Sequence, residues 1–298
     1  MLENIRQSRN RRLAACCLVI VAFTLPLALA PSVRATDAPP PFQNLEERLI
    51  ADGFDSQRVK AIFSSPRVSF EEGGVSAYFM HNEAKLNYKQ FTRKTNITLA
   101  QNYMQTHQKA LDAAQQAYGV DKEVITAIIL VETKLGKFTG KRSVINTLAT
   151  LSAMADDEPR QIIWENLPDN DRRMSRQKFE KKADRKSSWA YRELKAFLTY
   201  TEKEGMDPTT IMGSYAGAMG ISQFMPSNIA PYGKDGNADG KIDLFVHADA
   251  ISSIASYLKH YGWKPGISRE KAYKVVYHYN HSKYYVNTIL DVADRLKG

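Results

Sequence analysis

The chain has 298 residues, of which 43% are hydrophobic, and no tandem repeat, so it can bury a full core in one large domain or two modest ones. Its two cysteines are adjacent, at Cys16 and Cys17, which excludes a disulfide framework for the rest of the chain. The formal net charge is +9, and about +5 without the first 35 residues. This mild excess suits an anionic polymer or a membrane surface, but solubility explains it equally well, so charge leaves the function open.

The N-terminus has the composition of a secretory signal. A basic stretch, Met1–Arg12, precedes the apolar run Leu13–Ala30, and a site of small residues ends at Ala35. We therefore predict a signal peptide at residues 1–35, followed by a Pro-rich linker at residues 36–44.

Two alternatives to cleavage stay open for the apolar run. Its eighteen residues approach the length that spans a bilayer, which would make it an uncleaved anchor, although Pro26 and the small-residue site favour cleavage. The letters LAAC, which end at Cys16, resemble a bacterial lipoprotein box. They lie at the start of the apolar run, however, whereas a lipidated cysteine belongs at its end.

The rest of the chain is predicted to be mainly helical, because apolar residues recur at helical spacing between Gly and Pro breakers. Helices are expected in the following segments, the first and last of which each hold two: Phe42–Arg67, Ile97–Tyr118, Lys122–Gly136, Trp189–Glu204, Ala248–Tyr261 and Lys271–Lys297. Only Val68–Tyr78 and Gly240–Phe245 suggest extended chain. The predicted fold class is mainly α, with residues 45–298 as the folded domain.

The segment Asp156–Ser188 is densely charged with alternating sign, and it contains Pro159 and Pro168. Such a pattern is typical of solvated chain, so we interpret residues 156–188 as a charged insertion or mobile flap. The alternative is that its basic part, Arg172–Lys186, contacts an acidic polymer.

Small residues are concentrated at the start of Gly213–Ser227, which reads GSYAGAMGISQFMPS. Missing side chains let other groups come close to the backbone. Two interpretations are equally open: the chain packs tightly on itself, or a ligand lies against the backbone in a cleft.

One carboxylate lies on the apolar face of a predicted helix. Ile125, Ile128, Ile129 and Glu132 follow one another at positions i, i+3, i+4 and i+7, which places them on the same face. Partial burial favours the protonated form of a carboxyl group, as a general acid near neutral pH requires. The alternative is a Glu that reaches water past the end of the helix.

The segment Tyr277–Val286 combines aromatic rings with amide and hydroxyl groups, from Tyr279, Asn280, Ser282 and Tyr284. Neutral polar groups pair with the hydroxyl and acetamido functions of sugars, while flat rings cover the apolar side of a pyranose. Tyrosines of an ordinary core explain the segment equally well. His278 and His281 could share a metal ion, but no third ligand is evident nearby, so zinc is not expected.

The segment Asp235–Asp249 begins like the calcium loop of an EF-hand. Oxygen-bearing side chains alternate at positions 1, 3 and 5, and Gly240 takes position 6, but position 12 is Val246 rather than an acid. A plain Asp/Gly turn is the alternative. The predicted ligands of a structural Ca²⁺ ion are Asp235, Asn237, Asp239, Lys241 through its carbonyl, and Asp249.

Three short motifs follow one another along the chain: VETKLG at Val131–Gly136, GISQ at Gly220–Gln223, and the pair Tyr279 and Asn280. They resemble the Glu, Gly-x-x-Gln and Tyr-Asn motifs of the lytic transglycosylase and goose-type lysozyme superfamily. More closely, YGVDKEVITAIILVETKLGKFTGKRSVINTLATLS, GSYAGAMGISQFMPS and ADAISSIASYLKHYGW are similar to the membrane-bound lytic murein transglycosylase B family. The resemblance covers about Tyr118–Leu290.

This resemblance implies a lysozyme-like catalytic core with additional helices, and a small loop region that carries the EF-hand-like site. It implies cleavage of the β-1,4 bond between N-acetylmuramic acid and N-acetylglucosamine in peptidoglycan, with a 1,6-anhydromuramoyl product. Glu132 would act as acid and then as base, with no cofactor in the chemistry. The implied substrate-binding residues are Ser214, Gln223, Tyr257, Tyr279 and Asn280, with the two tyrosines as ring platforms.

The implied partner is a peptidoglycan strand rather than a nucleic acid. The implied location is the periplasm of a Gram-negative bacterium, where the chain would be a monomer with an optional membrane attachment through its N-terminus. Two alternatives remain for its activity: a muramidase that delivers water to the same bond, and a non-catalytic scaffold that binds peptidoglycan without turnover.

Overall fold

The computed structural model describes residues 40–80, 87–167 and 174–298. The predicted signal peptide and residues 36–39 of the predicted linker lie outside these ranges. The described residues all belong to one compact unit. Within the described ranges, no helix combines the length and the apolar character needed to cross a bilayer.

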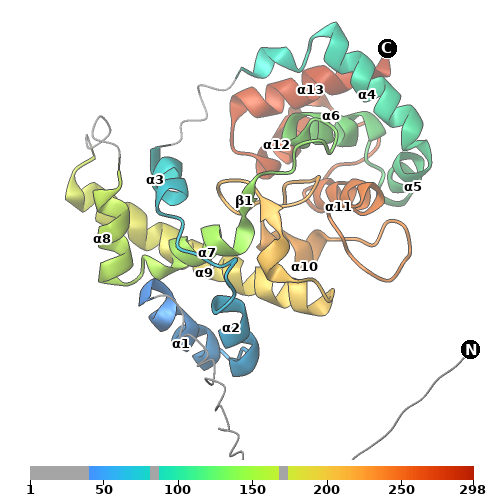
Figure 1. Ribbon diagram of the computed structural model, residues 1–298. Helices are drawn as coiled ribbons and strands as arrows, with labels where there is room; N and C mark the ends of the chain where they lie inside the picture. Colours follow the sequence, from blue (N-terminus) through green and yellow to red (C-terminus); the bar gives the residue numbers. More distant parts are fainter. Residues whose placement is uncertain (1–39, 81–86, 168–173) are drawn as a thin grey trace, which may run out of the picture. The chain divides into compact units, whose positions relative to one another are not determined.

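The structure confirms a mainly α fold (Figure 1). The α-helices are α1 (Gln43–Ala51), α2 (Ser56–Phe63), α3 (Glu72–Met80), α4 (Lys94–Thr106), α5 (Gln108–Tyr118), α6 (Lys122–Thr133), α7 (Val144–Ala153), α8 (Asp157–Glu165), α9 (Arg176–Lys203), α10 (Ile229–Tyr232), α11 (His247–His260), α12 (Arg269–Tyr279) and α13 (Lys283–Lys297). The 3₁₀ turns are η1 (Pro40–Phe42), η3 (Tyr88–Gln90), η5 (Pro208–Thr210) and η6 (Pro226–Asn228).

Helix α6 lies at the centre of the larger hydrophobic cluster. Every residue from Val124 to Leu130 is buried, as expected for a helix that is apolar on all sides. It packs against α4, α5, α11 and α13, which surround it in Figure 1. The last turn of α6, which holds Glu132, is therefore held rigidly by four neighbours.

The charged segment 156–188 is folded in its described parts, so the prediction of a solvated flap is wrong for them. Residues from α8 and α9 join a second hydrophobic cluster, in which Ile163, Phe179 and Ala183 are fully buried. The charged residues pair with one another on the outside of these two helices: Arg160 forms ion pairs with Glu180 and Asp184. Alternating charge on the outer face thus coexists with an apolar inner face.

Three smaller predictions also need correction. The helix predicted at Ile97–Tyr118 is two helices, because the backbone of His107 leaves helical geometry and its ring packs against Tyr103. Val68–Tyr78 is not extended throughout: α3 forms from Glu72 onward, since Val75 and Phe79 pack together into the second cluster. The folded chain also begins earlier than residue 45, with Phe42 of η1 fully buried.

The described strands are two short pieces far apart in sequence. Strand β1 (Arg142–Ser143) pairs antiparallel with β2 (Met212–Gly213). Because β1 follows the end of α6 and β2 opens the glycine-rich segment, this ladder brings the two motif-bearing segments together.

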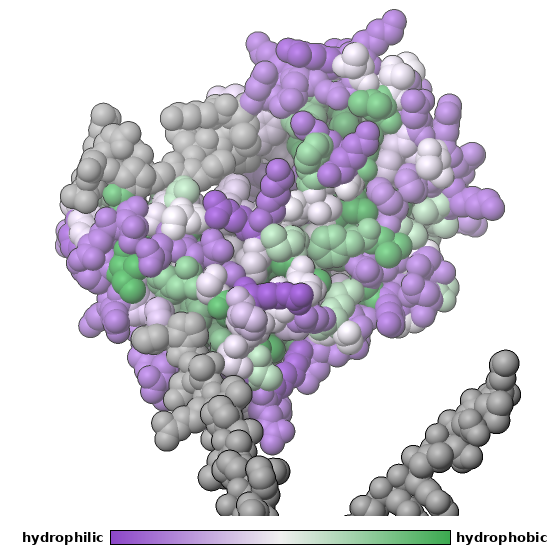
Figure 2. All heavy atoms as spheres, in the orientation of Figure 1, coloured by the Kyte–Doolittle hydropathy of each residue, from purple (hydrophilic) through white to green (hydrophobic). Residues whose placement is uncertain are grey.

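Hydrophilic side chains cover most of the face shown in Figure 2, and apolar ones reach its surface only in separate patches. A face of this kind suits a polar ligand better than a large apolar partner.

A cluster of three rings joins α4 to α11. The Tyr103 hydroxyl hydrogen-bonds Nδ1 of His247 at 2.9 Å, and the rings of His107 and His247 stack with centroids 4.3 Å apart. Burial lowers the pKa of both histidines below the usual 6.5, and the charge of His107 lowers that of His247 further.

We therefore expect acid to destabilise the fold through these histidines. Below pH 6.5 the unfolded chain binds protons that the folded chain accepts only at lower pH, so the unfolding temperature should fall as pH drops from 7 to 5. Thermal unfolding of His107→Gln should show a shallower fall. His247→Gln should show a shallower fall as well, because burial lowers its pKa in the same way. A fall as steep as that of wild type in both variants would contradict the assignment.

Candidate active site

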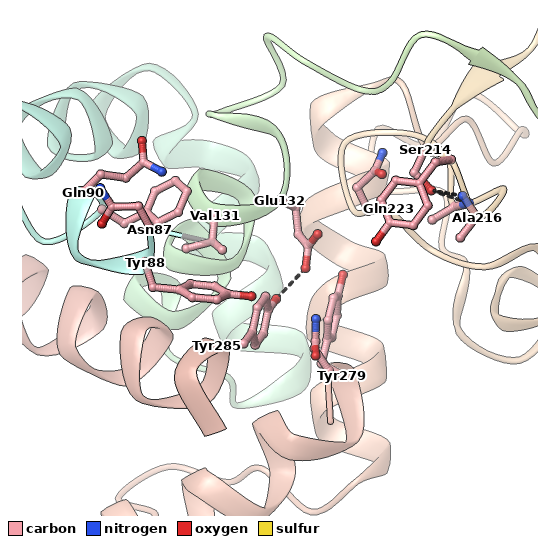
Figure 3. Close-up of a pocket in the computed structure, with 14 residues that line it drawn as sticks. Asn87, Tyr88, Gln90, Val131, Glu132, Ser214, Ala216, Gln223, Tyr279 and Tyr285 are labelled. Carbon is pink, nitrogen blue, oxygen red and sulfur yellow. Dashed lines mark hydrogen bonds between the residues drawn. The ribbon is translucent and has the colours of Figure 1, made fainter. Parts of the chain in front are cut away.

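A cavity of about 420 Å³ opens at the end of α6 (Figure 3). It is built by five parts of the chain: the segment around η3, the last turn of α6, the glycine-rich segment, the end of α12 and the start of α13. Its lining residues are Asn87, Tyr88, Gln90, Phe91, Val131, Glu132, Ser214, Tyr215, Ala216, Ala218, Gln223, Tyr279, Asn280 and Tyr285.

Glu132 is half-buried and points into this cavity (Figure 3). The three isoleucines that share its helix face are fully buried, as the spacing predicts. Tyr285 of α13 donates a hydrogen bond of 2.6 Å from its hydroxyl to Oε1 of Glu132. The carboxyl group is therefore held at the cavity wall rather than released into water past the end of the helix.

The end of α6 is shaped by three successive residues in left-handed conformation, Lys134, Leu135 and Gly136. They turn the chain away immediately after the helix. The hydroxyl of Thr133 accepts a hydrogen bond from the Gly136 amide and lies 3.2 Å from the Ile221 carbonyl, to which it donates. The helix that carries Glu132 is thereby fixed to the glycine-rich segment.

Two parallel tyrosine rings form one wall beside Glu132. Tyr279 and Tyr285 stack with centroids 6.4 Å apart, and the Tyr279 hydroxyl donates to the Ser222 carbonyl at 2.6 Å. Burial raises the pKa of both phenols well above the usual 10, and the negative charge of Glu132 raises them further. Both hydroxyls therefore stay protonated, and Tyr285 stays a hydrogen-bond donor toward Glu132.

The glycines of the glycine-rich segment serve internal packing. A Cβ at Gly213 would lie 2.3 Å from the Ala218 carbonyl oxygen, and one at Gly220 would lie 2.5 Å from Cβ of Leu244. Of the two interpretations of this segment, tight packing of the chain on itself holds for these glycines. The cavity is lined instead by the residues between them, Ser214, Ala216 and Ala218.

Ser214 is placed at the cavity by the turn that it stabilises. Its hydroxyl oxygen accepts hydrogen bonds from the amides of Ala216 and Ala218, at 3.2 and 3.1 Å. Gln223, across the cavity from Tyr285, has its amide nitrogen bonded to the carbonyls of Thr139 and Gly220. Both side chains are therefore rigid before any ligand arrives.

Asn280 and Tyr279 line the cavity, but Tyr257 does not. The Tyr257 ring is only 5% exposed, packs edge-on against Tyr279 with centroids 5.1 Å apart, and donates its hydroxyl to the His278 carbonyl. This position does not fit the predicted role of a ring platform. Tyr257 supports Tyr279 from beneath.

Besides Val131, Tyr215, Ala216 and Ala218, which lie inside the quoted motifs but are not among the predicted site residues, sequence reasoning missed five lining residues. Four of them, Asn87, Tyr88, Gln90 and Phe91, come from the segment before α4, which carries no motif. The fifth, Tyr285, lies inside the tyrosine-rich segment Tyr277–Val286. Its spacing of six residues from Tyr279 gave no signal that both rings would meet Glu132.

The loop predicted to bind calcium folds as a tight turn around the Asp235 carboxylate. Ala238 and Gly240, at positions 4 and 6, are left-handed, and the Asp235 carboxylate accepts from the amides of Asp239 and Gly240. Asp249 is fully buried and accepts from two backbone amides, of Gly236 and Asp243. Among the described residues, however, no three His, Cys, Asp or Glu side chains converge closely enough to hold a metal ion.

Comparison with known proteins assigns the family. A family model described as the transglycosylase SLT domain matches residues 37–270, which is most of the chain. The chain belongs to this family. The resemblance to lytic transglycosylases drawn from the three motifs is thereby confirmed.

One curated relative of this SLT domain is the membrane-bound lytic murein transglycosylase B of Escherichia coli (strain K12). It is 36% identical over 186 residues, which cover 62% of this chain and 44% of the relative. The match thus spans less than half of that protein's length.

Solved structures share the fold. The E. coli lytic transglycosylase SLT35 in complex with calcium has a TM-score of 0.70 at 24% identity, over 90% of this chain and 98% of that one. SltB3 from Pseudomonas aeruginosa in complex with NAG-anhNAM-pentapeptide has a TM-score of 0.69 at 20% identity, over 87% of this chain and 80% of that one.

Proposed function

We propose that the chain is a lytic transglycosylase that cleaves the β-1,4 bond between N-acetylmuramic acid and N-acetylglucosamine of peptidoglycan and leaves a 1,6-anhydromuramoyl end. One observation carries this proposal beyond family membership: among the described residues that line the cavity, Glu132 is the only Asp or Glu. Glycosidases that deliver water or form a covalent intermediate ordinarily use two carboxyl groups across the bond. A single carboxyl group suits a reaction in which the sugar supplies its own nucleophile.

Glu132 first gives its proton to the oxygen of the leaving sugar, while the acetamido group of the muramoyl residue supports the developing positive charge. The bond between C1 of the muramoyl residue and the leaving oxygen breaks. The carboxylate then takes the proton of the 6-hydroxyl, and the 6-oxygen forms a new bond to C1 that closes the anhydro ring. Tyr285 keeps the carboxyl group in one orientation through both steps, because its hydroxyl is a fixed donor to Oε1.

The sugar subsites follow from the other lining residues. Gln223 and Asn280 offer amide groups to hydroxyl and acetamido functions, Ser214 orients the acetamido group or Glu132, and the Tyr279 ring borders the site of the muramoyl ring. Supporting this assignment, a relative with the same fold is solved with a NAG-anhNAM-pentapeptide.

Digestion of purified sacculi by protein lacking residues 1–35 tests the reaction. Mass spectrometry of the released muropeptides should show anhydro ends, which lack the mass of one water compared with hydrolysed ends. Products with the full hydrolytic mass would instead identify a muramidase.

We also propose that the loop from Asp235 to Asp249 binds a structural Ca²⁺ ion. The donor set is supported by the chemistry of the loop: burial raises the pKa of the Asp249 carboxyl, and the nearby charges of Asp235 and Asp239 raise it further. A divalent cation would relieve both effects by favouring the charged form. The SLT35 relative, solved with calcium, has the same fold.

Calcium should accordingly raise the unfolding temperature by about 5–10 °C at a hundredfold excess over its dissociation constant. Scanning fluorimetry with Ca²⁺, Mg²⁺ or a chelator checks this expectation. Asp239→Asn should remove most of the Ca²⁺ effect, whereas the distant Asp294→Asn should keep it. A curve that is the same with Ca²⁺ and with the chelator would refute the site.

The proposed location is the periplasm, reached through the N-terminal signal. In this setting the chain works as a monomer on glycan strands, with a membrane attachment only if residues 13–30 stay uncleaved.

A further inference from the structure

A second pocket, of about 370 Å³, lies between α3 and α9 and carries a concentration of positive charge. Its lining side chains are two aromatic rings and three cations: Tyr78, Lys182, Arg185, Lys186 and Trp189. We call it the α9 basic pocket. No part of the proposed reaction uses it.

The cations of the α9 basic pocket are not neutralised within the described part of the chain. No ion pair there joins Lys182, Arg185 or Lys186 to a carboxylate; Lys182 donates instead to the Phe79 carbonyl at 2.6 Å. Nζ of Lys186 lies 3.5 Å from the centroid of the Tyr78 ring. Burial, with the like charges of Lys182 and Arg185, lowers the pKa of Lys186 to about 8. An anion in this pocket would gain from all three charges.

The α9 basic pocket adjoins the catalytic cavity through two aromatic rings. Tyr78 lines the pocket, and its ring contacts that of Tyr215 with centroids 5.3 Å apart. Tyr215 lines the catalytic cavity and is 41% exposed. A ligand that leaves the cavity over Tyr215 therefore meets Tyr78 next and the cations after it.

We propose that the α9 basic pocket binds the carboxylates of the stem peptide carried by the glycan strand whose sugars occupy the catalytic cavity. This inference rests on the proposed function, because it takes a peptidoglycan strand as the substrate. A stem peptide joined through its N-terminus keeps a free carboxylate at its far end. Five extended residues span about 17 Å. This length is enough to pass the 5.3 Å between the Tyr215 and Tyr78 rings and the 3.5 Å from the Tyr78 ring to Nζ of Lys186. Trp189 and Tyr78 offer flat surfaces to the peptide along the way.

Peptide binding can be measured without turnover. The probe is an N-acetylated acidic pentapeptide with free carboxylates, titrated against the whole protein while the fluorescence of Trp189 is followed; Trp189→Phe identifies that part of the signal. Saturable binding is expected, weakened about tenfold in Arg185→Gln/Lys186→Gln and when the carboxylates of the probe are amidated. Lys181→Gln, an exposed cation on the same helix, is the matched control and should bind like wild type.

The titration also separates other ligands. The proposal would be overturned if inorganic phosphate binds the protein and the peptide does not. It would also be overturned if the amidated peptide binds as tightly as the peptide with free carboxylates. A loss of binding in Lys181→Gln that equals the loss in the double variant would overturn it as well, because binding would then follow net charge alone.

Cleavage of two matched substrates connects the pocket to the reaction. Glycan strands that carry stem peptides should be cleaved with kcat/KM about tenfold lower by Arg185→Gln/Lys186→Gln than by wild type. Strands stripped of their peptides should be cleaved equally well by both proteins. An equal loss on both substrates would refute the peptide site. If wild type cleaves neither substrate, the proposed function fails, and the pentapeptide titration still decides whether the pocket binds carboxylates.

Discussion

Glu132→Gln is expected to lower the release of anhydromuropeptides from sacculi by about a thousandfold or more. The amide keeps the shape of the side chain and can accept the hydrogen bond from the Tyr285 hydroxyl, but it can neither give the proton to the leaving oxygen nor recover one. Liquid chromatography with mass spectrometry measures the rate of release and the masses of the muropeptides. Glu123→Gln, the same change at the other end of α6, is the matched control and should keep full activity.

The same variant separates the enzyme from its alternatives. Equal muropeptide release by wild type and Glu132→Gln would end the assignment of Glu132. If neither protein releases muropeptides while both bind sacculi, the chain is a scaffold. Unfolding temperatures of both variants close to that of wild type ensure that a loss of activity reflects chemistry rather than folding.

Gly220→Ala is expected to destabilise the fold by about 3–5 kcal/mol. Gly220 has φ of +73°, which costs an alanine about 1–2 kcal/mol, and the new Cβ would lie 2.5 Å from Leu244 Cβ and 2.6 Å from the Leu244 carbonyl oxygen. These Leu244 atoms belong to the backbone or are bonded directly to it, so they cannot move aside without shifting the chain. Denaturant unfolding of the purified variant measures the change in free energy.

Gly205→Ala provides a matched control for the backbone conformation. Its φ of +69° is nearly the same, but nothing lies within 4 Å of the position that the new Cβ would take. It should cost only about 1–2 kcal/mol, the cost of the left-handed conformation itself. Equal destabilisation by the two variants would show that Gly220 is needed for its backbone angle and not for close packing.

The motifs identified most of the cavity, because short segments there carry several lining residues each. Glu132, Ser214, Gln223, Tyr279 and Asn280 are all predictable from sequence and all line one cavity. The helical spacing of the three isoleucines and Glu132 predicts that they share one face, but it leaves open whether the carboxylate lies at the edge of the core or reaches water.

What sequence did not predict depends on contacts between distant segments. Tyr88 and Phe91 reach the cavity from a stretch with no regular period, so nothing local marks them. Tyr257 carries the polar tip and flat ring of a sugar platform, but only packing against Tyr279 and Phe224 decides that it is buried.

The prediction for segment 156–188 failed for a different reason. Its high charge density hides a sparse apolar pattern, in which Ile163 on α8 and Phe179 and Ala183 on α9 form one side of a cluster completed by Val75 and Phe79 of α3. Within this segment α8 buries only Pro159 and Ile163, and the start of α9 buries only Phe179, Ala183 and Ser187. These residues are too few to mark a buried helix face in the sequence.

Glu132 and its hydrogen-bond partner Tyr285 are 153 positions apart along the chain. Because a chain is made from its N-terminus, the segment that carries Glu132 is complete long before α13, which orients the carboxyl group and closes one wall of the cavity. Under the proposed function, an unfinished chain therefore lacks a complete active site. Removal of α13 from a folded molecule would have the same effect, because it takes away Tyr285.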